Sequence, residues 1–163
     1  KKHHILAGRP RRVLPVFLGE LAPMKRPIIS GDTITIPSSQ EYLTDVDVFI
    51  EGILRGYGAD ESVIADIAIS VSELVNNAIC HGNKSSGEKT VQVSIGRNGS
   101  KVSITITDQG GGFDPHNIED PLADENLLKE AGRGIFIVRN LMDSVEFGDV
   151  AGGTAVTITK SLN

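Results

Sequence analysis

The sequence has few of the residues from which disulfide frameworks, metal clusters and membrane-spanning helices are built. Its 163 residues include one cysteine, Cys80, and no tryptophan. No run approaches the roughly 18 uninterrupted apolar residues of a bilayer-spanning helix. A single cysteine excludes an internal disulfide framework and a cysteine-based metal cluster, and it suits a reducing compartment. These absences favour a globular protein in the cytoplasm, without a membrane partner.

Basic residues are scarce after position 27. Residues 1–27 hold seven of the 16 Lys and Arg residues and four of the seven prolines, with Glu20 as their one acidic residue. The rest has nine basic and 20 acidic residues, so we expect no direct binding to the phosphate backbone of nucleic acid. We expect residues 1–27 to be a tag, a leader, a flexible basic tail, or a membrane-surface or partner-binding arm, and residues 28–163 to form one domain.

Hydrophobic periodicity divides this domain into strands and helices. Alternating apolar and polar residues predict strands, and a 3.6-residue spacing predicts helices. The strands are expected at 33–36, 91–95, 102–107, 144–147 and 155–159, and the helices at 42–53, between Asp60 and Gly82, and at 135–142. Asn98-Gly99 predicts a tight hairpin turn. The order predicts an α+β fold, a two-layer sandwich whose mixed, mostly antiparallel sheet is covered on one face by three helices.

Glu73 and Asn77 are four residues apart in the second helix and therefore project from one ridge. With Asp66 and Ser70 they form a polar flank beside the apolar stripe, where a cleft could open. A carboxylate there can accept a proton from a nucleophile, and an amide oxygen can ligate Mg²⁺. The alternative for this pair is a solvated helix face. His81 continues the ridge at i+8, and we expect it to cap or pack rather than to act as a base.

Glycines mark three later boundaries between elements. Asp108 ends a strand before Gly110-Gly111-Gly112, where a carboxylate can accept a hydrogen bond from an exocyclic amine and glycines let the backbone approach a flat ring. Gly132-Arg133-Gly134 is expected directly before the third helix, where free N–H groups bind phosphate. Gly152 and Gly153 are expected to form the turn before the last strand, which Thr154 opens, so the Thr154 hydroxyl can join the network around a base. Each segment alone could be a turn, but their order favours a nucleotide site.

These segments resemble the GHKL ATPase superfamily over residues 33–160. Ser72 to Gly82 is similar to its N-box, residues 108–113 to its first glycine box, 132–134 to its second, and Gly153-Thr154 to its threonine motif. The branch of bacterial anti-sigma-factor serine kinases fits best, because its members are single domains with an N-box of the E-x-x-x-N-A-x-x-H-G type. The resemblance implies the Bergerat-type ATP-binding fold.

The resemblance also implies a role for each motif residue, with ATP and Mg²⁺ as cofactors. Glu73 would be the general base toward a serine hydroxyl, and Asn77 the Mg²⁺ ligand. Asp108 would accept a hydrogen bond from the adenine amine. Gly110 and Gly112 would shape the adenine pocket, and Thr154 would complete its hydrogen-bond network. The phosphates would be contacted by Gly132, Arg133 and Gly134, beneath a lid formed by residues 113–131.

The implied activity is that of an ATP-dependent protein serine/threonine kinase. Its implied substrate is a small anti-sigma-factor antagonist protein, and members of the branch can sequester a sigma factor and often form homodimers. The expected lid is acidic, with Lys129 as its one Lys or Arg residue. That feature leaves a second interpretation, a nucleotide-responsive protein-binding regulator with little or no phosphotransfer. A histidine kinase fragment is disfavoured because the sequence holds no phosphoacceptor helical hairpin.

Overall fold

Six strands pair into one sheet in the part of the chain that the structure, a computed structural model, describes: residues 26–111 and 130–162, without the side chains of 130–132. Every strand pairing among them is antiparallel. The order across the sheet is β1 (Ile28–Ser30), β2 (Thr33–Pro37), β3 (Thr90–Asn98), β4 (Lys101–Asp108), β6 (Gly153–Ser161) and β5 (Ser144–Val150).

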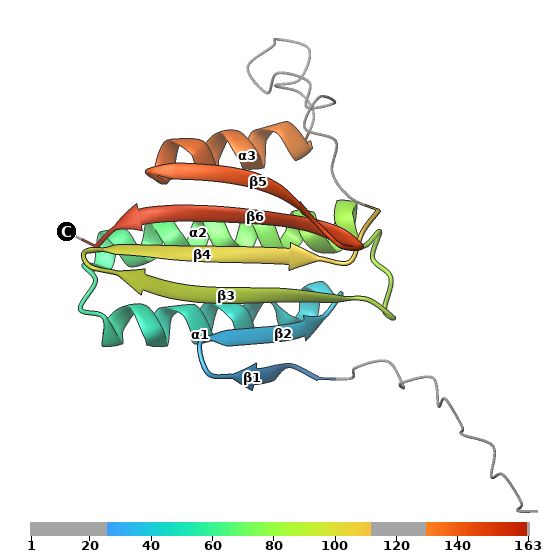
Figure 1. Ribbon diagram of the computed structural model, residues 1–163, viewed down its shortest axis with the longest axis horizontal. Coiled ribbons are helices and arrows are strands. Elements are labelled where there is room, and N and C mark those ends of the chain that lie inside the picture. The colour runs from blue at the N-terminus through green and yellow to red at the C-terminus, as the bar shows by residue number, and fades with distance from the viewer. Residues whose placement is uncertain (1–25, 112–129, 163) are drawn as a thin grey trace, which may run out of the picture.

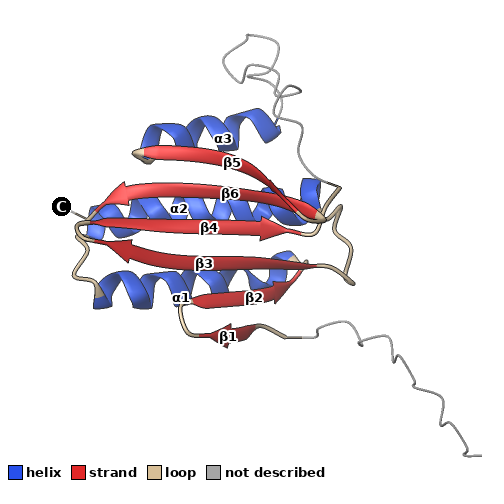
Figure 2. Ribbon diagram, in the orientation of Figure 1, coloured by secondary structure: helices blue, strands red, loops and turns tan. Residues whose placement is uncertain are grey.

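Three helices cover one face of this sheet (Figures 1 and 2). They are α1 (Leu43–Gly56), α2 (Glu61–Asn77) and α3 (Glu130–Leu141). A short 3₁₀ turn, η1 (Gln40–Tyr42), leads into α1, and a π-helical turn, η2 (Ala78–Gly82), follows α2. The predicted two-layer α+β sandwich is therefore confirmed.

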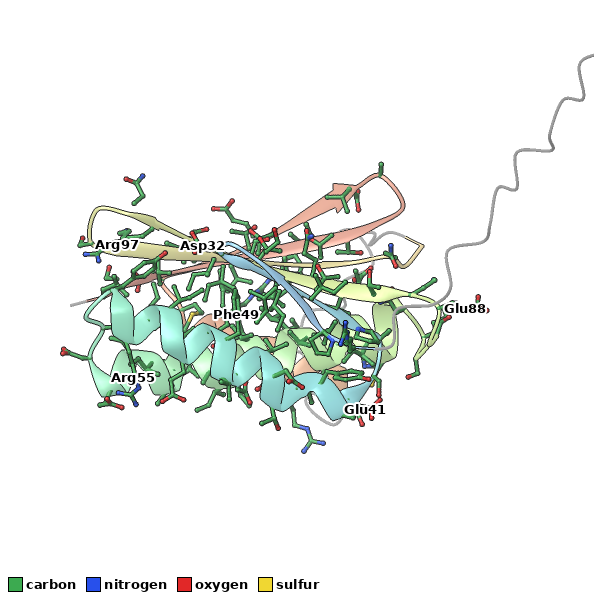
Figure 3. All side chains as sticks on the ribbon, turned by 90° about the horizontal axis from the view of Figure 1, so that it is seen from below. Asp32, Glu41, Phe49, Arg55, Glu88 and Arg97 are labelled. Carbon is green, nitrogen blue, oxygen red and sulfur yellow. The ribbon has the colours of Figure 1, made fainter. Side chains whose placement is uncertain are left out.

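The core lies between the two layers. Apolar side chains on the inner face of the sheet, such as Ile34 of β2 and Ile104 of β4, are at most 1% exposed. From the helix layer, Ile67 and Val71 of α2 are fully buried. Figure 3 shows this packing edge-on, with Phe49 of α1 between the helices and the sheet. Burial of one apolar face per element is what holds each helix on the sheet.

The helix from Glu61 to Gly82, which joins α2 and η2, is long and apolar enough to cross a membrane by length and composition. Half of its most apolar window is buried inside the domain. An apolar central helix that packs on a sheet has the same composition, because its core-facing stripe must be apolar.

Two basic side chains, those of Arg97 and Lys160, connect the sheet to the edges of the helix layer. Arg97 of β3 donates a hydrogen bond from Nη1 to the carbonyl of Tyr57 at 3.0 Å, and its guanidinium lies 5.4 Å from the centre of the Tyr57 ring. Lys160 of β6 donates to Asp66 of α2 at 3.0 Å and to the carbonyl of Leu141 at 2.5 Å. Lys160 therefore ties the end of α3 to α2.

The structure corrects the sequence prediction at two turns and adds one strand. The β3–β4 turn consists of Gly99 and Ser100, because Asn98 pairs with Lys101, and its positive φ falls on Gly99 alone. The predicted hairpin is confirmed, with its turn centred one residue later than Asn98-Gly99, and glycine in the first central position suits a type II′ turn. Likewise, Gly153 begins β6 opposite Val150 instead of lying in the turn. Strand β1, three residues long, is too short for alternation to reveal.

Candidate functional site

Glu73 and Asn77 lie together on α2 where α3 passes over it. Both side chains are half-buried. A Cβ added to Gly134 of α3 would lie 2.5 Å from Glu73 Oε2 and 3.7 Å from Asn77 Nδ2. The structure thus brings the last residue of the second glycine segment against the predicted carboxylate–amide pair. A side chain at position 134 would occupy the space that the Glu73 carboxylate fills.

The π turn η2 changes the course of the chain directly after Asn77. Its closing hydrogen bond runs from Asn83 N to Ala78 O, a five-residue step, at 2.7 Å. Each hydrogen bond of a π turn spans five residues instead of four, so the residues after Asn77 depart from α-helical spacing. His81 is exposed, and the π turn interrupts the α-helical spacing on which its expected place at i+8 depends. Gly82 instead reaches the carboxylate of Asp108.

Asp108 is the most enclosed ionisable side chain of the site, with 8% of its surface exposed at the end of β4. Its Oδ1 accepts hydrogen bonds from the backbone N–H groups of Gly110 at 2.8 Å and Thr154 at 3.3 Å. Its Oδ2 faces Gly82 and accepts no hydrogen bond within residues 26–111 and 130–162. One oxygen of a nearly buried carboxylate is therefore held by the backbone, while the other has no hydrogen-bond donor in the part of the chain that the structure describes.

Three glycines pack closely around Asp108 and its neighbours. A Cβ on Gly82 would collide with the Asp108 side chain, and a Cβ on Gly110 would collide with the carbonyl of Gly82. A Cβ on Gly153 would collide with the carbonyl of Asp108 itself. The absence of side chains lets η2, the end of β4 and the start of β6 meet at one point.

Thr154 lies beside Asp108, as its place in the threonine motif predicts, and it is 8% exposed. The contact that it makes to the carboxylate uses its backbone N–H, whereas the sequence pattern suggested its hydroxyl. The structure thus places Thr154 beside Asp108, and the role of its hydroxyl in an adenine network stays a prediction.

The second glycine segment is placed differently from the sequence prediction. Helix α3 begins at Glu130, so Gly132, Arg133 and Gly134 lie within its first turns rather than before it. In an α-helix the N–H of the fifth residue bonds to the carbonyl of the first, which assigns the Gly134 N–H to the helix. Arg133 is exposed. Gly112, which also carries an expected contact, and most of the expected lid at 113–131 lie outside the described residues.

Sequence reasoning missed two side chains that brace the site, Asn83 and Gln109. Asn83 is fully buried and accepts a hydrogen bond from the N–H of Gln109 at 2.9 Å. Gln109 Oε1 accepts one from the N–H of Thr90 at 2.7 Å. The only signal for them was their position, one residue after the N-box glycine and one residue after the strand-end aspartate.

The geometry thus combines a carboxylate oxygen that has no donor among the described residues, in a glycine-lined corner, with a carboxylate and an amide on the neighbouring helix. The pattern of the family described as "Histidine kinase-like ATPase domain" matches residues 36–160, which include both clusters. The chain belongs to the histidine kinase-like ATPase domain family.

Relatives within the histidine kinase-like ATPase domain family include named kinases. The serine-protein kinase RsbW of Bacillus licheniformis is 32% identical over 133 residues, covering 78% of this chain and 82% of that protein. The serine-protein kinase RsbW of Staphylococcus aureus strain JH9 is 31% identical over 132 residues, covering 77% and 82%.

A solved structure shows the same fold. The crystal structure of the RsbU and RsbW domains of Rv1364c from Mycobacterium tuberculosis matches with a TM-score of 0.59 and 24% sequence identity. The match covers 85% of this chain and 32% of that longer chain. At this identity the likeness concerns the fold of the histidine kinase-like ATPase domain.

The side chains that this histidine kinase-like ATPase domain offers to a ligand fit an adenine nucleotide and a hard cation. Asp108 Oδ2 is the acceptor that an exocyclic amine requires. The described residues contain no group of three or more His, Cys, Asp or Glu side chains that could hold a metal alone. Mg²⁺ commonly takes one or two protein oxygens and completes its shell with water and phosphate oxygens, which suits a site that offers Asn77.

Proposed function

We propose that this protein is an ATP-dependent protein serine/threonine kinase of the anti-sigma-factor type. The observation that carries the proposal is the arrangement of Glu73, Asn77 and Gly134, because it sets a half-buried carboxylate beside an amide where α2 meets α3. The names of the RsbW relatives support the kinase class. Oδ2 of Asp108, which has no hydrogen-bond donor among the described residues, supports adenine as the base.

In this proposal Oδ2 of Asp108 accepts a hydrogen bond from the exocyclic amine of adenine. The N–H groups of Gly110 and Thr154 donate to Oδ1. Two backbone donors on one oxygen fix the plane of the carboxylate, so the second oxygen has a defined direction. Gly110 lines the adenine pocket beside the Asp108 carboxylate. Gly132 and Arg133, in the first turn of α3, contact the phosphates, with Arg133 adding a charge-assisted hydrogen bond.

Glu73 is the group that accepts the proton of the incoming serine hydroxyl, and Asn77 holds the metal. When bound, ATP supplies the phosphoryl group and Mg²⁺ neutralises phosphate charge. Glu73 suits the role of base because α3 covers it and limits the rotamers of its carboxylate. A base fixed in this way can orient the serine oxygen as well as remove its proton.

The partner in this proposal is a small anti-sigma-factor antagonist protein that carries the serine, and a sigma factor is a second partner. The protein acts in the cytoplasm, and a homodimer is its expected assembly. These assignments follow from the branch of the family that the N-box resembles.

The test begins with partners captured from the native host by the tagged protein, with and without ATP. Captured proteins are then incubated with the protein, Mg²⁺ and ATP, and phosphoserine is located by mass spectrometry. We expect one small partner to gain phosphate on a single serine or threonine. A partner that is retained in an ATP-dependent way but is never phosphorylated would instead support the nucleotide-responsive binding module.

A further inference from the structure

Asn83 is a fully buried polar side chain that the proposed chemistry does not use. It follows η2 directly and has both amide atoms paired. Its Oδ1 accepts the N–H of Gln109 at 2.9 Å, and its Nδ2 donates to the carbonyl of Thr90 at 2.9 Å. Its own N–H closes the π turn on Ala78 at 2.7 Å. One residue therefore links η2 to the end of β4 and to the start of β3.

A second hydrogen bond braces the same corner. The N–H of Thr90 donates to Oε1 of Gln109 at 2.7 Å, so Thr90 and Gln109 are joined directly as well as through Asn83. Both links end on Gln109, which is adjacent to Asp108 in the chain. The network thus fixes the backbone on both sides of the glycine-lined corner.

The residue next to Asn83, Gly82, is the one that touches the Asp108 carboxylate. Gly82 and Gly110 contribute only backbone atoms around that carboxylate. Because glycines have no side chains, Gly82 and Gly110 cannot fix the distance between η2 and the end of β4 by side-chain contacts. The hydrogen-bond pattern of a π turn is rare and must be maintained by neighbouring contacts. A buried amide with both atoms satisfied supplies that constraint, because leaving either partner unpaired costs free energy.

We propose that Asn83 is a positioning residue for adenine recognition, which holds Gly82 against Asp108 and so directs Oδ2 of that carboxylate toward the 6-amino group of the nucleotide. This inference rests on the proposed function and adds the residue that sets its base selectivity. Without the Asn83 amide, η2 is free to shift away from β4. The Asp108 carboxylate can then rotate, and the direction of its free oxygen is lost.

The readout that separates positioning from stability is discrimination between ATP and inosine triphosphate. These nucleotides share the ribose and triphosphate but differ at position 6 of the base, where ATP donates a hydrogen bond and inosine triphosphate accepts one. A site built around an acceptor rejects the analogue that lacks the donor, because the buried acceptor is then left unpaired. General destabilisation of the protein weakens the binding of both nucleotides by the same factor.

The experiment measures dissociation constants of both nucleotides by calorimetry, for the full-length protein and for Asn83→Ala, at a temperature below the unfolding transition of each. We expect Asn83→Ala to lower the preference for ATP by about tenfold, with the affinity for inosine triphosphate changed by less than about twofold. The matched control is Asn98→Ala in the exposed β3–β4 hairpin, which should keep the preference of the parent. An unchanged preference in Asn83→Ala, or an equal loss for both nucleotides, overturns the inference.

Gln109→Met is the second variant, and it decides the question if Asn83→Ala does not fold. Gln109 is exposed, so the substitution deletes the Thr90 brace without opening the core. We expect a loss of preference of about threefold, and an unchanged preference would overturn the inference. If the parent protein itself shows no preference for ATP, the proposed role of Asp108 fails. If the parent prefers ATP and all variants do too, only the role of Asn83 fails.

Discussion

Gly134→Ala is expected to leave the fold intact and to impair phosphotransfer. The added methyl group would lie 2.5 Å from Glu73 Oε2, whereas ordinary van der Waals contact begins at 3.4 Å. Position 134 lies inside α3, where alanine is favoured over glycine. The two effects therefore have opposite signs: the helix gains intrinsic stability while the carboxylate is displaced.

The magnitudes follow from the same contact. Glycine to alanine inside a helix stabilises by about 1 kcal/mol. The clash involves the far end of a flexible side chain, so we expect the Glu73 carboxylate to move by about 1 Å and α3 to stay in place. A displacement of that size at a catalytic group can lower the rate by roughly a hundredfold. The free energy of unfolding should be unchanged or slightly higher.

The assay compares kcat for phosphorylation of the partner with the urea midpoint of unfolding. The control is Gly52→Ala in α1, which is also a helical glycine to alanine change but has no atom within 4 Å of the new methyl group. Gly52→Ala should gain similar stability and keep full activity. If Gly134→Ala phosphorylates at the parent rate while folded, Glu73 does not depend on its observed position, and the proposed base is refuted.

Three further outcomes are expected. Asp108→Asn keeps an oxygen for the backbone donors but presents an amide N–H to adenine, so ATP affinity measured by calorimetry should fall by about tenfold or more; an unchanged affinity would exclude the adenine contact. The hydrogen bond from the Ser161 hydroxyl is the main cause that lowers the pKa of Asp143. Its stabilising effect should therefore be present above pH of about 4 and be lost as pH falls through the lowered pKa, and urea unfolding of Asp143→Asn should lack this pH dependence. Lys160→Met removes the tie to Asp66 and to the end of α3, and should lower the free energy of unfolding by about 1 kcal/mol; no change would mean that apolar packing alone fixes α3.

The elements of the fold were predictable where periodicity is long. The apolar stripe of α2 and the alternation of β3 and β4 each extend over several repeats, so their type follows from pattern alone. The start of α3 was not predictable in the same way, because two of its first five residues, Gly132 and Gly134, are poor helix formers. There the tertiary packing of α3 on α2 outweighs local propensity.

For the site, the sequence indicated which positions lie together but not always through which atoms. Glu73 and Asn77 share a ridge by helical geometry, and Asp108 ends a strand, so both were visible locally. The approach of Gly134 to Glu73 joins residues from two helices and has no local signature. The π turn after Asn77 and the bridging role of Asn83 depend on hydrogen bonds between distant elements, which periodicity cannot reveal.

The central claim is that Glu73 removes the serine proton in an ATP-dependent transfer. Its most direct test compares the parent with Glu73→Gln, a substitution that keeps the shape of the side chain but not its basicity. Transfer of labelled phosphate to the captured partner is measured beside ATP affinity. We predict that Glu73→Gln binds ATP within about twofold of the parent and transfers phosphate at least about a hundredfold more slowly. Equal phosphorylation by both proteins would contradict the claim.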